Sequence, residues 1–120
     1  MINPPPERRK YPRLEKNIPV KLSSDEFDVV TETRNLSCAG AYCRVNKYFE
    51  PMTKLDIHLL LPIKKDSKVV TKKISCRGVV VRVESQAGNE YFNIAIYFND
   101  ISKRDTKSIA DYISSVFAKK

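Results

Sequence analysis

The chain has little of the residue types that most catalytic and metal-binding motifs need. Its 120 residues include no tryptophan, three glycines and one histidine. So few glycines exclude the glycine-rich phosphate loops of Walker and dinucleotide-binding motifs. The single histidine, His58, lies between apolar residues of a predicted strand, where we expect a solvated rim position rather than a catalytic or metal-binding one. These absences argue against an enzyme and against a resident metal or cofactor.

Cysteine is also scarce. Cys38, Cys43 and Cys76 are odd in number and form no Cys-x-x-Cys pair, so neither a disulfide framework nor a zinc ribbon is supported. A Cys-His nucleophile would need Cys38 or Cys43 to face His58, which nothing in the spacing indicates. We expect reduced thiols that are mostly packed in the interior.

The chain has no long apolar run. No segment approaches the roughly 20 apolar residues that span a bilayer, and the start, Met-Ile-Asn-Pro-Pro-Pro, lacks the apolar core of a signal peptide. We therefore expect a cytoplasmic protein without membrane insertion. Its 22 Lys and Arg against 14 Asp and Glu give a net charge of +8. That balance favours phosphate-bearing partners or anionic membrane surfaces without choosing among them.

The composition changes after the first residues. Residues 1–13 carry four prolines and four basic side chains with little to bury, which predicts a flexible basic arm. Residues 14–120 suit a single domain, in which apolar residues alternate as they do in half-buried strands. The clearest alternating sets are Ile18, Val20 and Leu22; Leu55, Ile57, Leu59 and Leu61; and Phe92, Ile94, Ile96 and Phe98.

Three further segments complete the predicted sheet. Residues 26–36 and 40–46 read as two strands joined at a corner. Over 69–84 the apolar parity changes, and we expect a bulge at Gly78 that turns the following odd-numbered valines inward. About six strands result.

The carboxyl end changes to helical spacing, with apolar residues at 109, 112, 113, 116 and 117. Ser102 and Asp105 suit the start of that helix, whose apolar stripe would cover the open end of a barrel. The predicted fold is all-β: a six-stranded antiparallel barrel with a C-terminal α-helix and a flexible N-terminal arm.

The arm carries a pair of arginines that suit an anionic ligand. Arg9 and Arg13 are four residues apart with Pro12 between them, so two guanidinium groups can reach around one anion in a non-helical segment. Each can hold a phosphate or the O6 and N7 edge of a guanine. Taken alone, the arm is better explained as a solvated basic tail.

The corner between the strands 26–36 and 40–46 carries a second motif. Asn35 and Ser37 are two residues apart and can project toward the same side. Gly40 permits a positive φ and close approach of a ligand to the backbone. The alternative is a plain turn in which Asn35 and Ser37 make local hydrogen bonds.

Together the two motifs resemble those of the PilZ domains, which bind the bacterial second messenger cyclic di-GMP. Arg9-Lys-Tyr-Pro-Arg13 is similar to the family's Arg-x-x-x-Arg, and Asn35-Leu-Ser37-Cys-Ala-Gly40 to its Asp/Asn-x-Ser-x-x-Gly. The segments 76–83 and 92–98 and the closing helix occur in the family's order. The resemblance covers about residues 7 to 117 and implies a PilZ-like barrel.

The resemblance also implies a ligand site. Arg9 and Arg13 would hold phosphates and guanine edges, and Arg8 would add a third guanidinium. Asn35, Ser37 and Gly40 would line the opposite side of cyclic di-GMP on the barrel surface. Ala95 departs from the family, which usually has glycine there, and its methyl group would crowd a base.

The leading hypothesis is a non-enzymatic receptor. Cyclic di-GMP would bridge the arm and the barrel, order the arm and expose a new surface to a downstream protein partner. One alternative is a binder of single-stranded nucleic acid that stacks bases on outward Tyr91 and Tyr97, although the strands lack a dense aromatic and basic pattern. Another is a PilZ-like interaction module that does not bind the nucleotide.

Overall fold

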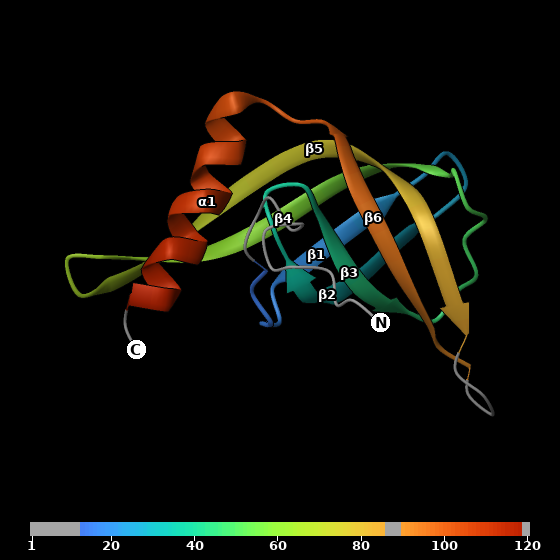
Figure 1. The fold of residues 1–120 in the computed structure, drawn as a ribbon, viewed down its shortest axis with the longest axis horizontal. Helices are drawn as coiled ribbons and strands as arrows, with labels where there is room; N and C mark the ends of the chain where they lie inside the picture. The colour runs from blue at the N-terminus through green and yellow to red at the C-terminus, as the bar shows by residue number, and fades with distance from the viewer. Residues whose placement is uncertain (1–12, 86–89, 119–120) are drawn as a thin grey trace, which may run out of the picture.

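The structure, a computed structural model, describes residues 13–85 and 90–118, and the predicted arm residues 1–12 lie outside this range. It shows a closed antiparallel barrel with the strand order β1-β2-β3-β6-β5-β4 (Figure 1). The strands are β1 (Pro19–Ser23), β2 (Asp28–Leu36), β3 (Gly40–Val45), β4 (Lys54–Lys65), β5 (Lys68–Ser85) and β6 (Phe92–Asp100). The predicted six-stranded antiparallel fold is confirmed.

The barrel interior is filled by the residues whose alternation predicted it. Ile18, Val20 and Leu22 are buried, and so are the four leucine and isoleucine side chains at 55, 57, 59 and 61. In β6, Ile94, Ile96 and Phe98 are buried and Phe92 is partly buried. One polar side chain, Thr33, shares this interior. Its hydroxyl accepts from the amide of Ile18 and donates to the carbonyl of Lys16, so its burial leaves no hydrogen bond unmade.

The pairing of β5 with β6 shifts register between Arg77 and Gly78, as predicted, but the inward face does not change there. Gly78 points into the barrel, where an added Cβ would lie 2.6 Å from Cδ1 of Ile57 and 2.8 Å from Cγ2 of Ile96. Val80 is buried and Val81 is exposed, which is the reverse of the predicted parity. The inward face changes three residues later, where Val81 is an extra residue in the pairing of β5 with β6, and Val83 then packs partly against the core as predicted.

Helix α1 (Lys103–Ala118) follows β6 and lies against the barrel (Figure 1). The hydroxyl of Ser102 accepts from the amide of Asp105 at 3.0 Å, which confirms the predicted cap. Ile109, Tyr112 and Ile113 are buried in the same core as the strands. Within the described residues, no helix is long and apolar enough to cross a membrane.

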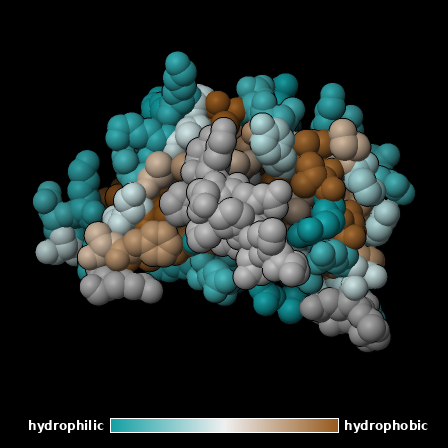
Figure 2. Space-filling view, viewed as in Figure 1, coloured by the Kyte–Doolittle hydropathy of each residue, from teal (hydrophilic) through white to brown (hydrophobic). Residues whose placement is uncertain are grey.

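The hairpin of β4 and β5 extends beyond the rest of the sheet, past α1 on the left of Figure 1. Its two-residue turn, Asp66 and Ser67, has φ values of 50° and 70°, as a tight hairpin turn requires. In the space-filling view, hydrophilic side chains cover this end of the molecule (Figure 2).

Candidate functional site

Five of the predicted ligand residues lie around one pocket on the outer surface of the barrel. Its volume is about 300 Å³. Arg13, Asn35, Ser37, Gly40 and Ala95 are among the residues that line it, together with Tyr42, Arg82 and Tyr97. Arg8 and Arg9 lie outside the described residues. The fold therefore brings together four separate parts of the sequence, while the role of the predicted residues in binding stays a prediction.

Arg13 reaches this pocket because the next residue is held by the sheet. Leu14 is buried and pairs with Leu36 as an isolated β-bridge. The amide of each donates to the carbonyl of the other, at 2.8 and 2.9 Å. This bridge places the exposed Arg13 beside Asn35 and Ser37, which flank Leu36. The last arginine of the predicted arm thus has a fixed point of attachment.

A β-bulge turns Asn35 toward the pocket. In β2, Thr33 pairs with Cys43 and Asn35 with Tyr42, so Arg34 is an extra residue. Thr33 points inward, and in a regular strand Asn35 would do the same. The bulge shifts the alternation by one residue and leaves Asn35 partly exposed on the outer surface. Its side-chain amide makes no hydrogen bond to another described residue.

The hydroxyl of Ser37 already has a partner in the turn. It accepts from the amide of Ala39 at 3.1 Å, and the amide of Ser37 donates to the carbonyl of Gly40 at 2.9 Å. The local role that a plain turn would give this serine is therefore present. The hydroxyl also donates to the carbonyl of Gly40 at 3.4 Å, a long hydrogen bond that it would have to give up in order to donate to a ligand.

Glycine is needed at position 40 for a different reason from the predicted one. It lies in extended β3, and its φ is outside the left-handed region, so the predicted positive φ is wrong. A Cβ at this position would overlap the carbonyl oxygen of Ile96 in the paired strand β6. Glycine is thus required for close packing of two backbones at the pocket floor.

The sequence did not predict Tyr42 and Arg82 as pocket residues, because strand pairing places them there. Ala95 lies between Tyr42 of β3 and Arg82 of β5. The Tyr42 hydroxyl donates to Oε1 of Glu84 at 2.6 Å, and Nε of Arg82 lies 3.4 Å from Oε2 of the same carboxylate. The hydrogen bond to Glu84 is the main cause that raises the pKa of Tyr42. Tyr42 is two residues after Gly40 in the same strand, so alternation could have predicted that it faces outward with Gly40. Arg82 faces outward only because of the bulge at Val81, which the sequence does not show.

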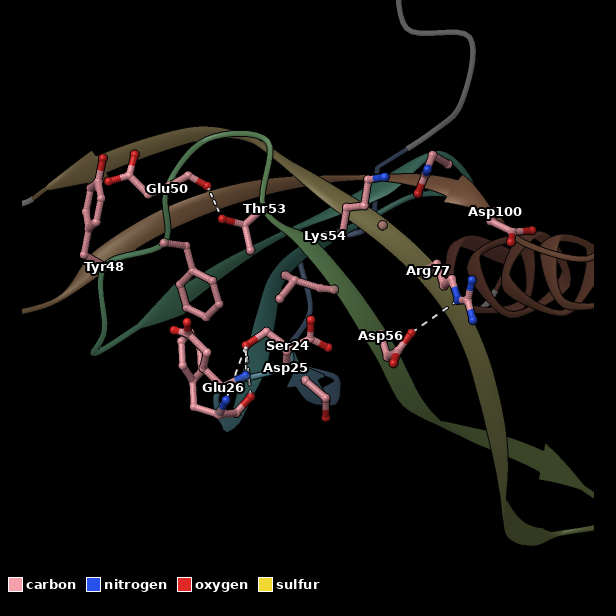
Figure 3. A pocket seen from close by; sticks show the side chains of 16 residues that line it. Ser24, Asp25, Glu26, Tyr48, Glu50, Thr53, Lys54, Asp56, Arg77 and Asp100 are labelled. Carbon is pink, nitrogen blue, oxygen red and sulfur yellow. Dashed lines mark hydrogen bonds and ion pairs between the residues drawn. The ribbon is translucent and has the colours of Figure 1, made fainter.

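A larger cavity lies elsewhere and suits an anion poorly. It has a volume of about 750 Å³ and is drawn in Figure 3. Its carboxylates are those of Asp25, Glu26, Glu50, Asp56 and Asp100, against the cations of Lys54 and Arg77. One of the cations, Arg77, is paired with Asp56 at 3.4 Å. Because the excess charge is negative, this cavity repels phosphate groups. The smaller pocket is the better candidate.

The groups that might support catalysis are not activated. Burial raises the pKa of Cys43 and Cys76 to about 12, and it also raises the pKa of the partly buried Cys38. Such thiols stay protonated near neutral pH and are weak nucleophiles. His58 shares a hydrogen bond of 3.0 Å with Ser75 on the outer face. Across residues 13–85 and 90–118, no three metal-binding side chains are grouped to hold an ion.

Comparison with known proteins identifies the family. The profile of the PilZ domain matches residues 7–115, so the chain belongs to the PilZ domain family. PilZ domains are generally regulatory receptors rather than enzymes. The resemblance seen in the motifs is thereby confirmed. No curated protein matches the chain.

Solved structures share the fold. The Bacillus subtilis inhibitor of motility (MotI/DgrA) superposes with a TM-score of 0.81 at 22% identity, over 98% of this chain and 57% of that one. The PilZ domain of YcgR from Escherichia coli, solved with c-di-GMP, gives 0.58 at 12% identity, over 94% and 98%. The PilZ domain of CeSA from a cellulose-synthesizing bacterium gives 0.54 at 22% identity, over 89% and 96%. The chain thus spans little more than half of the Bacillus protein, and these identities establish the fold alone.

Proposed function

We propose that this chain is a non-enzymatic receptor for cyclic di-GMP. The observation that carries the proposal is the meeting of Arg13, Asn35 and Ser37 at one outward pocket. The PilZ family match and the YcgR structure with c-di-GMP support the choice of ligand. A mixed set of guanidinium, amide and hydroxyl groups is what a ligand with two phosphates and two guanines needs.

The charges around the pocket favour an anionic ligand. Arg13 and Arg82 line it, and Arg34 is near enough that its charge partly opposes the rise in the pKa of Tyr42 caused mainly by Glu84. The neighbouring carboxylate of Glu84 is engaged by both Tyr42 and Arg82. An incoming phosphate therefore meets a positive field, in which Arg13 can form a bidentate pair.

The remaining part of the site is expected from the arm. Arg9 would grip the ligand from the side opposite Asn35 and Ser37, with Arg8 as a third guanidinium. Binding would then order the arm over the barrel and present a new surface to a downstream protein. The bridge between Leu14 and Leu36 supports this arrangement, because it anchors the arm at the pocket edge.

Calorimetric titration with cyclic di-GMP tests the proposal. Arg13→Ala should weaken binding by about 10- to 100-fold, since a hydrogen bond to a charged group contributes about 1.5–3 kcal/mol. Arg77→Ala is the matched control, because this exposed arginine lies in the acidic cavity and should leave the affinity unchanged. Circular dichroism spectra should be identical for all three proteins.

Three results would contradict the proposal. Wild-type affinity in Arg13→Ala would exclude this pocket. Absence of binding in the wild-type protein would favour an interaction module that does not use the nucleotide. A single-stranded oligonucleotide that binds tightly, with an affinity that falls steeply with salt, would instead favour the nucleic-acid alternative.

A further inference from the structure

The tip of the β4–β5 hairpin stands apart from the rest of the sheet. Strand β1 pairs with β4 only as far as Leu59, and β6 pairs with β5 only from Arg77. Residues 60–65 and 68–73 therefore pair only with each other, as a two-stranded ribbon. In Figure 1 this ribbon extends past α1 and ends in the turn at Asp66 and Ser67.

This ribbon holds an unusual concentration of positive charge. Five lysines and one aspartate give residues 64–73 a net charge of +4, half of the net charge of the whole chain. The lysines are Lys64, Lys65, Lys68, Lys72 and Lys73. Within the part of the chain that the structure describes, none of them forms an ion pair. Lys65 also lies directly opposite Lys68, and like charges in that position destabilise a hairpin.

Aliphatic side chains are exposed among these lysines. Val69 is 67% exposed, Val70 is 49% exposed and Leu60 is 40% exposed. Alternation puts Val69 on one face of the ribbon and Val70 on the other. The tip is therefore a convex element that carries both cations and apolar groups, at the hydrophilic end of the view in Figure 2.

We propose that the tip of the β4–β5 hairpin docks on the surface of an anionic phospholipid bilayer. Lysine ammonium groups would lie among the lipid phosphates, while Val69 and Val70 would enter the boundary between headgroups and acyl chains. The flexible stems of the lysines can extend from the apolar region toward the phosphates. Contact with the lipid phosphates would also relieve the repulsion between Lys65 and Lys68.

The chemistry of the tip favours a bilayer over other anionic partners. Residues 60–73 contain no arginine and no aromatic side chain, so they offer neither the forks nor the stacking surfaces used for nucleic acids. A protein partner would need a concave surface shaped to the ribbon. A bilayer accepts a convex cationic tip without such a cavity, and this docking is independent of the dinucleotide pocket.

Sedimentation with vesicles tests the proposal. The wild-type chain should sediment with vesicles of phosphatidylglycerol and phosphatidylcholine and not with pure phosphatidylcholine. The triple variant Lys64→Gln, Lys65→Gln and Lys68→Gln should lose on the order of 100-fold in affinity, since each lysine near the surface contributes about a factor of five. Added salt should weaken the wild-type binding, because it screens exposed charges.

A matched variant separates this site from general charge attraction. Lys54→Gln, Lys103→Gln and Arg104→Gln remove the same number of exposed charges elsewhere and should leave sedimentation close to that of the wild type. Equal loss in both variants would overturn the proposal. Absence of sedimentation of the wild-type chain would also overturn it. Tighter binding to an oligonucleotide than to anionic vesicles would do the same. Circular dichroism melts should show that both variants are folded.

A fluorescent label tests the apolar contact. In a Cys38→Ser background, the remaining native thiols are buried, so Val69→Cys can be labelled with a polarity-sensitive dye. Its emission should shift to the blue with anionic vesicles, whereas a label at Lys54→Cys should not respond. No shift at position 69, or equal shifts at both positions, would refute insertion of the tip.

Discussion

Replacement of Gly40 by alanine distinguishes two reasons for a glycine in the ligand motif. If the glycine admits a ligand, the alanine should reduce binding and leave the fold intact. The structure instead predicts a loss of stability, because the new Cβ would overlap the carbonyl oxygen of Ile96. That oxygen belongs to a backbone paired in the sheet and cannot move aside as the end of a flexible side chain can.

The magnitude follows from the geometry. Extra atoms in a tightly packed position cost about 1–3 kcal/mol. Separation of β3 from β6 would also strain the hydrogen bond from the amide of Phe98 to the carbonyl of Ala39, 2.9 Å long and worth about 1 kcal/mol. The lower entropy of the unfolded alanine chain offsets about 0.4–1 kcal/mol. We expect Gly40→Ala to lower the free energy of unfolding by about 2 kcal/mol and the midpoint temperature by about 8 °C.

Urea unfolding followed by circular dichroism is the suitable assay, because the chain has no tryptophan for fluorescence. Ala95→Gly serves as a control in the neighbouring strand, since it removes a methyl group from the outer surface instead of adding one in a tight contact. Wild-type stability of Gly40→Ala together with weaker cyclic di-GMP binding would refute the packing argument. It would restore the ligand-approach explanation.

Three further predictions concern the site, the core and the response to pH. Ala95→Gly should tighten cyclic di-GMP binding in calorimetry by a few-fold if its methyl group crowds a base, and unchanged affinity would show that it does not. Thr33→Val should lower the free energy of unfolding by about 1–3 kcal/mol, because it leaves the buried amide of Ile18 without its acceptor. A typical hydrogen bond contributes about 1 kcal/mol, so a loss below about 0.5 kcal/mol would contradict this account. The raised pKa of about 12 for Cys43 and Cys76 means that the unfolded chain releases these protons first as the pH rises above about 8.5. Stability should therefore be complete below that pH and fall above it, by up to about 1.4 kcal/mol per thiol for each pH unit, in urea titrations between about pH 7.5 and 9.5. The double variant Cys43→Val and Cys76→Ala should lose this slope, and an unchanged slope would assign it to other groups.

Much of the barrel could be predicted because strand burial leaves a local pattern. In β4 and β6 the predicted inward residues alternate without interruption, and the structure buries all of them except Phe92, which is partly buried. The helix could also be predicted, from the helical spacing of its apolar residues and from the cap at Ser102. Failure occurred in β5, where Val79, Val80 and Val81 are consecutive. Because these valines occupy both parities, alternation there carries no information about which face is inward.

The candidate site also combines residues that the local sequence predicted with residues that only strand pairing brings to it. Asn35, Ser37 and Gly40 are close in the sequence, and their motif predicted a common position that the structure places at one pocket. Arg13 and Ala95 join them through the bridge of Leu14 to Leu36 and the pairing of β3 with β6. Tyr42 and Arg82 were missed, since their place beside Ala95 is a matter of register between strands.

The sequence by itself determined the residue types, the strand and helix periods, and the two motifs that indicate the PilZ family. These features depend on neighbours along the chain, so they can be read without coordinates. Only the tertiary structure decided that Arg34 and Val81 are extra residues in their strand pairs, which turns Asn35 and Arg82 outward. It also decided that Gly40 faces a carbonyl oxygen rather than open space. A bulge and a backbone contact are properties of two strands together, and neither strand's sequence specifies them alone.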